Sequence, residues 1–394
     1  MKHTTFLTAL LSLGLLCGVN SSHAAQPQEK PTYLDASRPI EERVEDALSR
    51  MTLEEKVAMC HAQSKFSSAG VPRLGIPEIW MTDGPHGVRM EKMWDEWSDA
   101  KWTNDSCTAF PALTCLAATW NPDMADAYGQ AIGEEARYRN KAILLGPGVN
   151  IYRTPLNGRN FEYMSECPIL NYLAGAVEVE AMEKTGSHAG PKHFVGNDQE
   201  FYREGLVCFF NEQAFREGNL KAFEGSIRVA NAGGLMQSFE RLGLKWYSAS
   251  YALNTTILRN EWGWNGAIDT DAAPCFDEYV DGGYKNHAAE VLDAGTQEWC
   301  LDGVGGHGQW ILQKAKDTDD GHLLELLTEA AISWEYAISR SVVTNGTASN
   351  SAIEHVTPYW QTAITAEIAV TGILTAVFFV LLVLSKTKKK AKKQ

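Results

Sequence analysis

The stretch Gly266-Ala267-Ile268-Asp269-Thr270-Asp271 decides the fold that the sequence predicts. It follows segment 258–265, whose Trp-Gly-Trp-Asn end is typical of a helix stop followed by a tight turn. The stretch itself predicts a short strand that ends in the carboxylate of Asp271. In barrels and doubly wound sheets, the carboxyl ends of parallel strands open into the cleft and carry the chemistry. A strand-terminal aspartate is also a common turn or cap residue, so both interpretations stay open at this point.

Helix and strand patterns alternate along the chain on both sides of this stretch. The sequence predicts helices over 40–60, 122–139, 169–184 and 212–232, and strands over 79–81, 143–145, 188–194 and 234–236. Within the first helical segment, Thr52-x-x-Glu55 has the pattern of a capping box. Strands separated by helices at this spacing indicate βα units and a parallel sheet, so the predicted fold class is α/β.

Five further segments carry polar residues at the predicted strand ends. They are Thr82–Arg89, Gly146–Arg153, Gly158–Glu162, Pro191–Phe194 with Asn197–Arg203, and Met236–Phe239. Together with the opening stretch they resemble, in collinear order from about 48 to 303, the barrel domain of glycoside hydrolase family 3. That family contains β-glucosidases, β-xylosidases and related exo-acting enzymes. The resemblance implies a (β/α)8 TIM-like barrel and a β-glucosidase-like O-glycosyl hydrolase that acts on terminal non-reducing β-linked sugars.

Retaining glycoside hydrolysis needs a carboxylate nucleophile and an acid/base carboxyl group roughly 5–5.5 Å apart. The resemblance places the nucleophile at Asp271, while Asp269 shares its strand face one step deeper. In most two-domain members the acid/base is a glutamate of a separate domain, and the sequence does not locate it here. The Lys-His-Phe-x-Gly-His-Gly pattern of the histidine-based subgroup is also not matched, because Gly196-Asn197-Asp198 stands at its end.

Sugar hydroxyls are held well by charged groups, because charge-assisted hydrogen bonds are stronger than neutral ones. The substrate-binding residues implied by the resemblance are Asp83, Arg153, Arg159, Lys192, His193 and Met236, and the supporting residues are Glu162, Glu200 and Arg203. Taken alone, each type has an ordinary structural explanation. Asp83 suits a turn cap, the two arginines suit the surface, and a lone histidine is often buried and bonded to the backbone.

Three positions depart from the family pattern. Ala272 stands where many members have tryptophan, Cys167 replaces the usual aspartate of Glu-Asp-Pro, and Glu240 replaces the usual asparagine of Ser-Phe-Asn-Arg. These departures leave a second hypothesis open, that of a non-catalytic carbohydrate-binding relative that lacks the acid/base domain. A second chain that supplies the acid/base is a further possibility.

The two ends of the chain have the composition of targeting and membrane segments. Residues 1–25 predict a secretory signal peptide, followed by the barrel over 26–345 and a stalk over 346–362. An apolar segment over 363–384 predicts one transmembrane helix, and the lysine-rich tail 385–394 satisfies the positive-inside rule. The expected location is the cell membrane, single-pass type I, with the barrel extracellular or periplasmic.

The net charge of −14 disfavours nucleic acid and anionic substrates and suits a neutral oligosaccharide or β-glycoside. No Cys-x-x-Cys pair occurs among the eight cysteines, so neither a metal site nor a cofactor is expected. A disulfide between Cys107 and Cys115 is compatible with export.

Overall fold

The structure is a computed structural model, and it describes residues 31–60, 62–64, 66–89, 106–272, 289–298, 311–314, 316–317, 321–340 and 359–391. The chain divides into two compact units, Met1–Gly346 and Thr347–Gln394, which are described separately. The predicted signal peptide lies outside the described residues.

Parallel strands form the centre of the first unit. They are β3 (Ile79–Asp83), β4 (Ile143–Leu145), β5 (His188–Ala189), β7 (Gly234–Met236) and β10 (Ala267–Asp269). β3, β4 and β5 are hydrogen-bonded in that order, and β7 pairs with β10. A bridge between Phe194 and Gln237 joins the continuation of β5 to the end of β7, and another joins Asp269 to Glu298. These five strands therefore follow one another side by side in chain order, as in a TIM-like barrel.

The first strands differ from the all-parallel arrangement that a regular (β/α)8 barrel requires. β1 (Ala62–Ser64) and β2 (Ser67–Ser68) pair antiparallel, and β2 pairs antiparallel with β3. The short connection between β1 and β2 explains this difference, because a parallel crossover needs a dozen residues or more. A separate sheet contains β6 (Val207–Cys208), β8 (Arg241–Leu242) and β9 (Lys245–Trp246). Across the described residues the unit is thus barrel-like, and its start is irregular.

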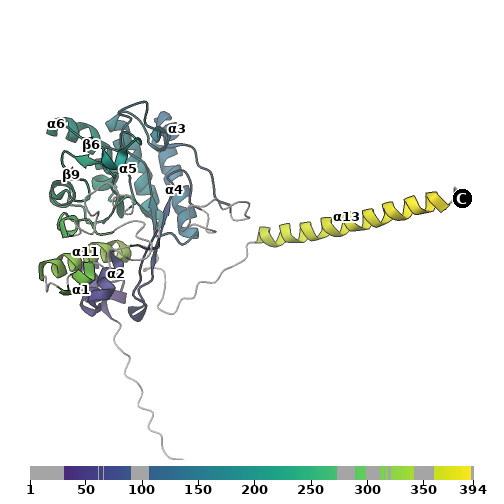
Figure 1. Ribbon diagram of the computed structural model, residues 1–394, viewed down its shortest axis with the longest axis horizontal. Coiled ribbons are helices and arrows are strands. Elements are labelled where there is room, and N and C mark those ends of the chain that lie inside the picture. Colours follow the sequence, from purple (N-terminus) through teal and green to yellow (C-terminus); the bar gives the residue numbers. More distant parts are fainter. Residues whose placement is uncertain are drawn as a thin grey trace, which may run out of the picture. The chain divides into compact units, whose positions relative to one another are not determined.

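Helices cover the outside of the strands (Figure 1). The α-helices of this unit are α1 (Ile40–Arg50), α2 (Leu53–Met59), α3 (Leu113–Ala118), α4 (Pro122–Tyr138), α5 (Pro168–Thr185), α6 (Glu212–Ala214), α7 (Lys221–Glu224) and α11 (Gly321–Arg340). The 3₁₀ turns are η1 (Thr32–Leu34), η2 (Pro72–Leu74), η3 (Asn160–Glu162) and η4 (Arg203–Gly205), and the π-helical segments are η5 (Phe215–Leu220), η6 (Gly225–Val229) and η7 (Ala252–Glu261).

The predicted helices over 122–139 and 169–184 are confirmed by α4 and α5. The predicted helix over 40–60 is in fact two helices, because Thr52 begins a new one. Its side chain accepts from the Glu55 backbone, while the Glu55 side chain accepts from the Thr52 backbone, so the predicted capping box is confirmed.

Two apolar cores hold the helices on the strands. One contains residues of α1, β3 and α11, such as Leu48, Met81 and Leu327, and the other lies under α4, α5 and α7. α4 and α5 lie side by side because Gly129 permits close approach, since a Cβ there would be 2.2 Å from the Glu178 carbonyl oxygen (Figure 1). Trp264, from the stop signal before β10, is buried and donates to the Ala232 carbonyl at 2.6 Å.

The second unit contains helix α13 (Tyr359–Ala391). It takes in part of the predicted stalk and much of the predicted lysine-rich tail. Across the described residues, no helix combines the length and apolarity needed to cross a membrane, so the transmembrane helix predicted over 363–384 gains no support. In the first unit Cys115 is a free thiol, so the bridge to Cys107 that export would permit does not form.

Asp269 and Glu298 are acidic side chains inside the barrel-like unit. Their side chains are buried, and the two residues are partners in a parallel bridge. Burial, reinforced by the negative charge of Asp269, raises the pKa of Glu298 well above its ordinary value of 4.5. Glu298 is therefore held protonated at pH values where an exposed glutamate is ionised.

We predict that Glu298→Gln stabilises the protein increasingly as pH rises above 4.5. Above pH 4.5 the carboxyl group ionises in the unfolded chain but stays protonated in the folded protein, so the free energy of unfolding falls by about 1.4 kcal/mol per pH unit until the folded-state pKa is reached. Glutamine does not titrate and has no such cost. Thermal unfolding midpoints measured from pH 5 to pH 9 test this. Glu212→Gln, at a side chain that is 81% exposed, is the control. A difference between wild type and Glu298→Gln that does not change with pH would contradict the assignment.

Candidate functional site

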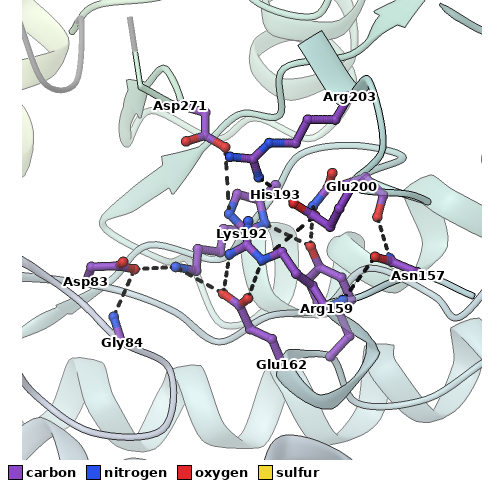
Figure 2. A network of polar contacts seen from close by, with 12 residues as sticks. Asp83, Gly84, Asn157, Arg159, Glu162, Lys192, His193, Glu200, Arg203 and Asp271 are labelled. Atoms are coloured by element: carbon purple, nitrogen blue, oxygen red, sulfur yellow. Dashed lines mark hydrogen bonds and ion pairs between the residues drawn. The ribbon is translucent and has the colours of Figure 1, made fainter. Parts of the chain in front are cut away.

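Eight of the ten predicted site residues converge beyond the carboxyl ends of the central strands. The polar cluster, as we name it, contains Asp83, Arg159, Glu162, Lys192, His193, Glu200, Arg203 and Asp271 (Figure 2). Its members come from five separate segments of the chain. They are joined by hydrogen bonds and ion pairs, except that His193 and Asp271 approach without a normal hydrogen-bond distance.

Asp83 is the last residue of β3 and opens a tight turn. Its Oδ1 accepts from the Gly84 backbone N–H at 2.9 Å. Gly84 has a φ of 117°, and a Cβ there would be 2.2 Å from the Gly87 carbonyl oxygen, so only glycine fits. Asp83 thus caps its turn, which is the ordinary structural role predicted for it from the sequence. Its side chain is also 33% exposed, so its carboxylate is accessible to a ligand.

Lys192 is the buried cation that ties the cluster together. Its ammonium group contacts Asp83 and lies 3.2 Å from Glu162, while its side chain is 2% exposed. Burial opposes its charge, but the carboxylates of Asp83 and Glu162 outweigh burial and raise the pKa of Lys192. Conversely, burial favours neutral Asp83 and Glu162, but the Lys192 charge overcomes it and lowers both pKa values. All three groups are therefore held ionised.

Arg159 is fixed by a two-pronged contact. Its Nε and Nη2 donate to the two carboxylate oxygens of Glu162 at 2.6 and 2.7 Å. Glu200 lies 3.9 Å from the Arg159 guanidinium and 3.0 Å from that of Arg203. The bidentate contact with Glu162 holds the plane of the Arg159 guanidinium in one orientation.

His193 lies between Tyr163 and Asp271. Its Nδ1 is 3.0 Å from the Tyr163 hydroxyl, and its Nε2 is 3.8 Å from Asp271 Oδ2. Burial, followed by the positive charges of Arg159, Lys192 and Arg203, holds the pKa of His193 well below 6.5. The imidazole is therefore neutral at physiological pH.

Asp271 follows β10 at its carboxyl end, with a side chain that is 14% exposed. Its Oδ1 accepts from the Ala272 backbone N–H at 2.8 Å. Burial raises the pKa of Asp271, and the charges of Arg203, Arg159 and Lys192 oppose that rise. Asp269 lies one step deeper, in register with Met236 of β7. Of the two aspartates, Asp271 is the one that lies in the polar cluster.

Arg153 and Met236 lie outside the polar cluster. Arg153 pairs with Asp198 at 2.9 Å, stacks over Phe210 at 4.6 Å, and has a side chain that is 47% exposed. The sequence did not indicate this pairing, which directs the Arg153 side chain toward the loop that contains Asp198. Met236 is buried within the sheet at the end of β7. Their predicted sugar contacts stay predictions.

Sequence analysis did not single out Tyr163 or Asn197. Tyr163 is fully buried, and its hydroxyl lies 2.6 Å from the Asn197 amide nitrogen. Asn197 also donates to Glu200 at 3.2 Å. Its place in the segment Asn197–Arg203 was the available signal, whereas Tyr163 adjoins the Gly158–Glu162 motif without belonging to it.

Residues 48–299 match the family model described as the glycosyl hydrolase family 3 N terminal domain. The chain belongs to glycosyl hydrolase family 3. The match contains all the described strands of the barrel-like unit and every member of the polar cluster. Within the described ranges, this family 3 domain has no group of three or more His, Cys, Asp or Glu side chains arranged to hold a metal ion.

Known β-glucosidases resemble the chain in sequence. It is 49% identical over 306 residues to beta-glucosidase BoGH3A of Bacteroides ovatus, covering 75% of this chain and 41% of that protein. It is 37% identical over 289 residues to thermostable beta-glucosidase B of Acetivibrio thermocellus, covering 73% and 36%. The chain therefore spans less than half the length of these relatives.

Solved family structures resemble its fold. Beta-glucosidase 3B from Thermotoga neapolitana in complex with glucose matches with a TM-score of 0.68 and 28% identity, over 77% of this chain and 43% of that one. The Kluyveromyces marxianus β-glucosidase in complex with glucose matches with a TM-score of 0.66 and 26% identity, over 78% and 35%.

We predict that Lys192→Met destabilises the protein strongly. The substitution leaves Asp83 and Glu162 without the ammonium group that balances them, and breaking a buried ion pair costs about 3–5 kcal/mol. Denaturant unfolding of wild type and variant measures the change. Lys184→Met, at an exposed pair with Glu180, is the control and should have little effect. A loss no larger than that of the control would show that Lys192 does not hold the cluster.

Proposed function

We propose that this protein is a retaining, exo-acting β-glycosidase of the β-glucosidase type, which works through a covalent glycosyl-Asp271 intermediate. The observation that carries the proposal is the position of Asp271 at a strand end, 3.8 Å from a neutral His193 and within the field of three cations. Relatives with the same domain are named β-glucosidases, and two solved neighbours contain glucose.

The polar cluster has the groups needed to hold one terminal sugar ring. Asp83 accepts hydrogen bonds, and Lys192 and Arg159 donate them as charged groups, which strengthens each bond. The Lys192 ion pairs fix the Asp83 carboxylate, while Glu162 fixes the Arg159 guanidinium. A site held rigid before binding loses less conformational entropy when the sugar enters.

The proposed reaction has two steps at the anomeric carbon. A carboxylate oxygen of Asp271 forms a bond to this carbon as the bond to the leaving oxygen breaks, and water then cleaves the glycosyl ester. The leaving oxygen needs a proton, yet Asp83 and Glu162 are held ionised by Lys192, and Glu200 is engaged in its pair with the Arg203 guanidinium at 3.0 Å. We therefore assign the acid/base to a carboxyl group outside the polar cluster, on this polypeptide or on a second chain.

We also propose that the barrel works outside the cytoplasm, attached to the cell membrane by a single pass. Support comes from the sequence of residues 1–25 and from the apolar run 368–384 followed by six lysines. Membrane fractionation of cells, with and without residues 358–394, tests this. Full-length protein recovered without detergent in the soluble fraction would contradict it.

We predict that Asp271→Asn lowers turnover of an aryl β-glucoside by several orders of magnitude and leaves glucose binding intact. The amide keeps the shape of the side chain but cannot form the glycosyl ester. Asp269→Asn, the matched control one step deeper in the same strand, should cost much less. Initial rates and calorimetric glucose titrations of the three proteins measure both properties. If wild type and Asp271→Asn bind glucose equally and neither releases aglycone above background, the chain is a carbohydrate-binding protein instead.

A further inference from the structure

A chain of hydrogen bonds runs from Glu200 through Asn197 and Tyr163 to His193. Asn197 Nδ2 lies 3.2 Å from Glu200 Oε1 and 2.6 Å from the Tyr163 hydroxyl, and that hydroxyl lies 3.0 Å from His193 Nδ1. Tyr163, Asn197 and His193 are at most 2% exposed, so water does not compete for these bonds.

Glu200 determines which atom donates and which accepts in each of these hydrogen bonds. The Glu200 carboxylate pairs with the Arg203 guanidinium at 3.0 Å, and the oxygens of a carboxylate accept hydrogen bonds. The Asn197 atom that faces Glu200 is therefore the amide nitrogen. Because the same nitrogen faces Tyr163, it donates to the hydroxyl oxygen there too.

Asn150 also contacts the Tyr163 hydroxyl, and because its Oδ1 already accepts from a backbone N–H, it faces this hydroxyl with its amide nitrogen. The Tyr163 hydroxyl therefore receives hydrogen bonds from asparagine side chains and has His193 as the acceptor for its own proton. Its oxygen accepts from Asn197, so its O–H is directed to His193 Nδ1. A neutral imidazole that accepts at Nδ1 carries its hydrogen on Nε2. Nε2 is the nitrogen that faces Asp271, at 3.8 Å.

We propose that Tyr163 is a positioning residue that holds His193 in the Nε2–H tautomer, so that His193 presents a donor to a sugar hydroxyl and to Asp271. With the opposite tautomer, the Nε2 lone pair would face the Asp271 carboxylate and repel it. In this arrangement His193 binds as a donor and does not take a proton at Nε2. The tautomer follows from geometry alone, whereas its effect on catalysis rests on the proposed function.

The test is nitrogen NMR of the full-length protein labelled with ¹⁵N-histidine. Comparison with His193→Gln assigns the His193 signals among the ten histidines. In wild type we expect Nε2 to resonate as a protonated nitrogen and Nδ1 as an unprotonated one. In Tyr163→Phe we expect a mixture of both tautomers, because Nδ1 loses its donor while the ring stays in place. Tyr33→Phe, which loses only a bond to the Leu74 carbonyl, should leave the His193 signals unchanged.

Glucose affinity supplies a second measurement. We expect Tyr163→Phe to bind glucose about tenfold more weakly, the effect of one lost well-directed hydrogen bond, and Tyr33→Phe to bind as wild type does. A wild-type His193 protonated on Nδ1 would overturn the proposal, even if Tyr163→Phe did not fold. An unchanged tautomer together with unchanged affinity in folded Tyr163→Phe would also overturn it. The NMR measurement needs no turnover, so its result is separate from whether the protein is a glycosidase.

Discussion

The buried ammonium group of Lys192 is the interaction on which the site depends. It lies between the carboxylates of Asp83 and Glu162, which come from different segments of the chain. Without this cation two acidic groups would face each other at the strand ends, and Glu162 would be less able to orient Arg159. The ion pairs therefore join the end of β3 to the loop after β4 and the segment after β5. Packing of the helices brings these segments near, and the charges fix their side chains.

Burial and the surrounding cations together set the pKa values of the two groups nearest the proposed chemistry. Positive charge and burial act together on His193 and keep it neutral. On Asp271 they act against each other, because burial favours the neutral acid while Arg203, Arg159 and Lys192 favour the carboxylate. This environment is consistent with the proposed roles of the two groups. The neutral imidazole ring of His193 donates hydrogen bonds, and the Asp271 carboxylate beside it attacks the sugar. Glu240 is buried where the family usually has asparagine, and burial, reinforced by the negative charge of Asp271, raises its pKa well above the ordinary value.

Much of this site can be predicted from the sequence, because each motif follows a strand and parallel strands end at one edge. That rule is enough to bring Asp83, Lys192 and Asp271 together. It does not predict the antiparallel β1–β2 hairpin, which depends on the length of one connection. The pairing of Arg153 with Asp198 was also missed, since it depends on where two loops meet. Tyr163 could not be recognised, because its proposed role is to donate its hydroxyl proton to His193 Nδ1. The direction of a hydrogen bond cannot be predicted from the spacing of residues in the sequence.

In the proposed mechanism, Asp271 becomes covalently bound to the sugar. The most direct test of this step is incubation of the purified full-length chain with an aryl 2-deoxy-2-fluoro-β-glucoside, followed by intact-mass and peptide mass spectrometry. The activated leaving group departs with little protonation, and the fluorine slows hydrolysis of the ester, so the intermediate accumulates. We expect one added fluoroglucosyl group per chain, located on the peptide that contains Asp271 and absent from Asp271→Asn. Labelling at another residue, or no labelling of a chain that binds glucose, would contradict it.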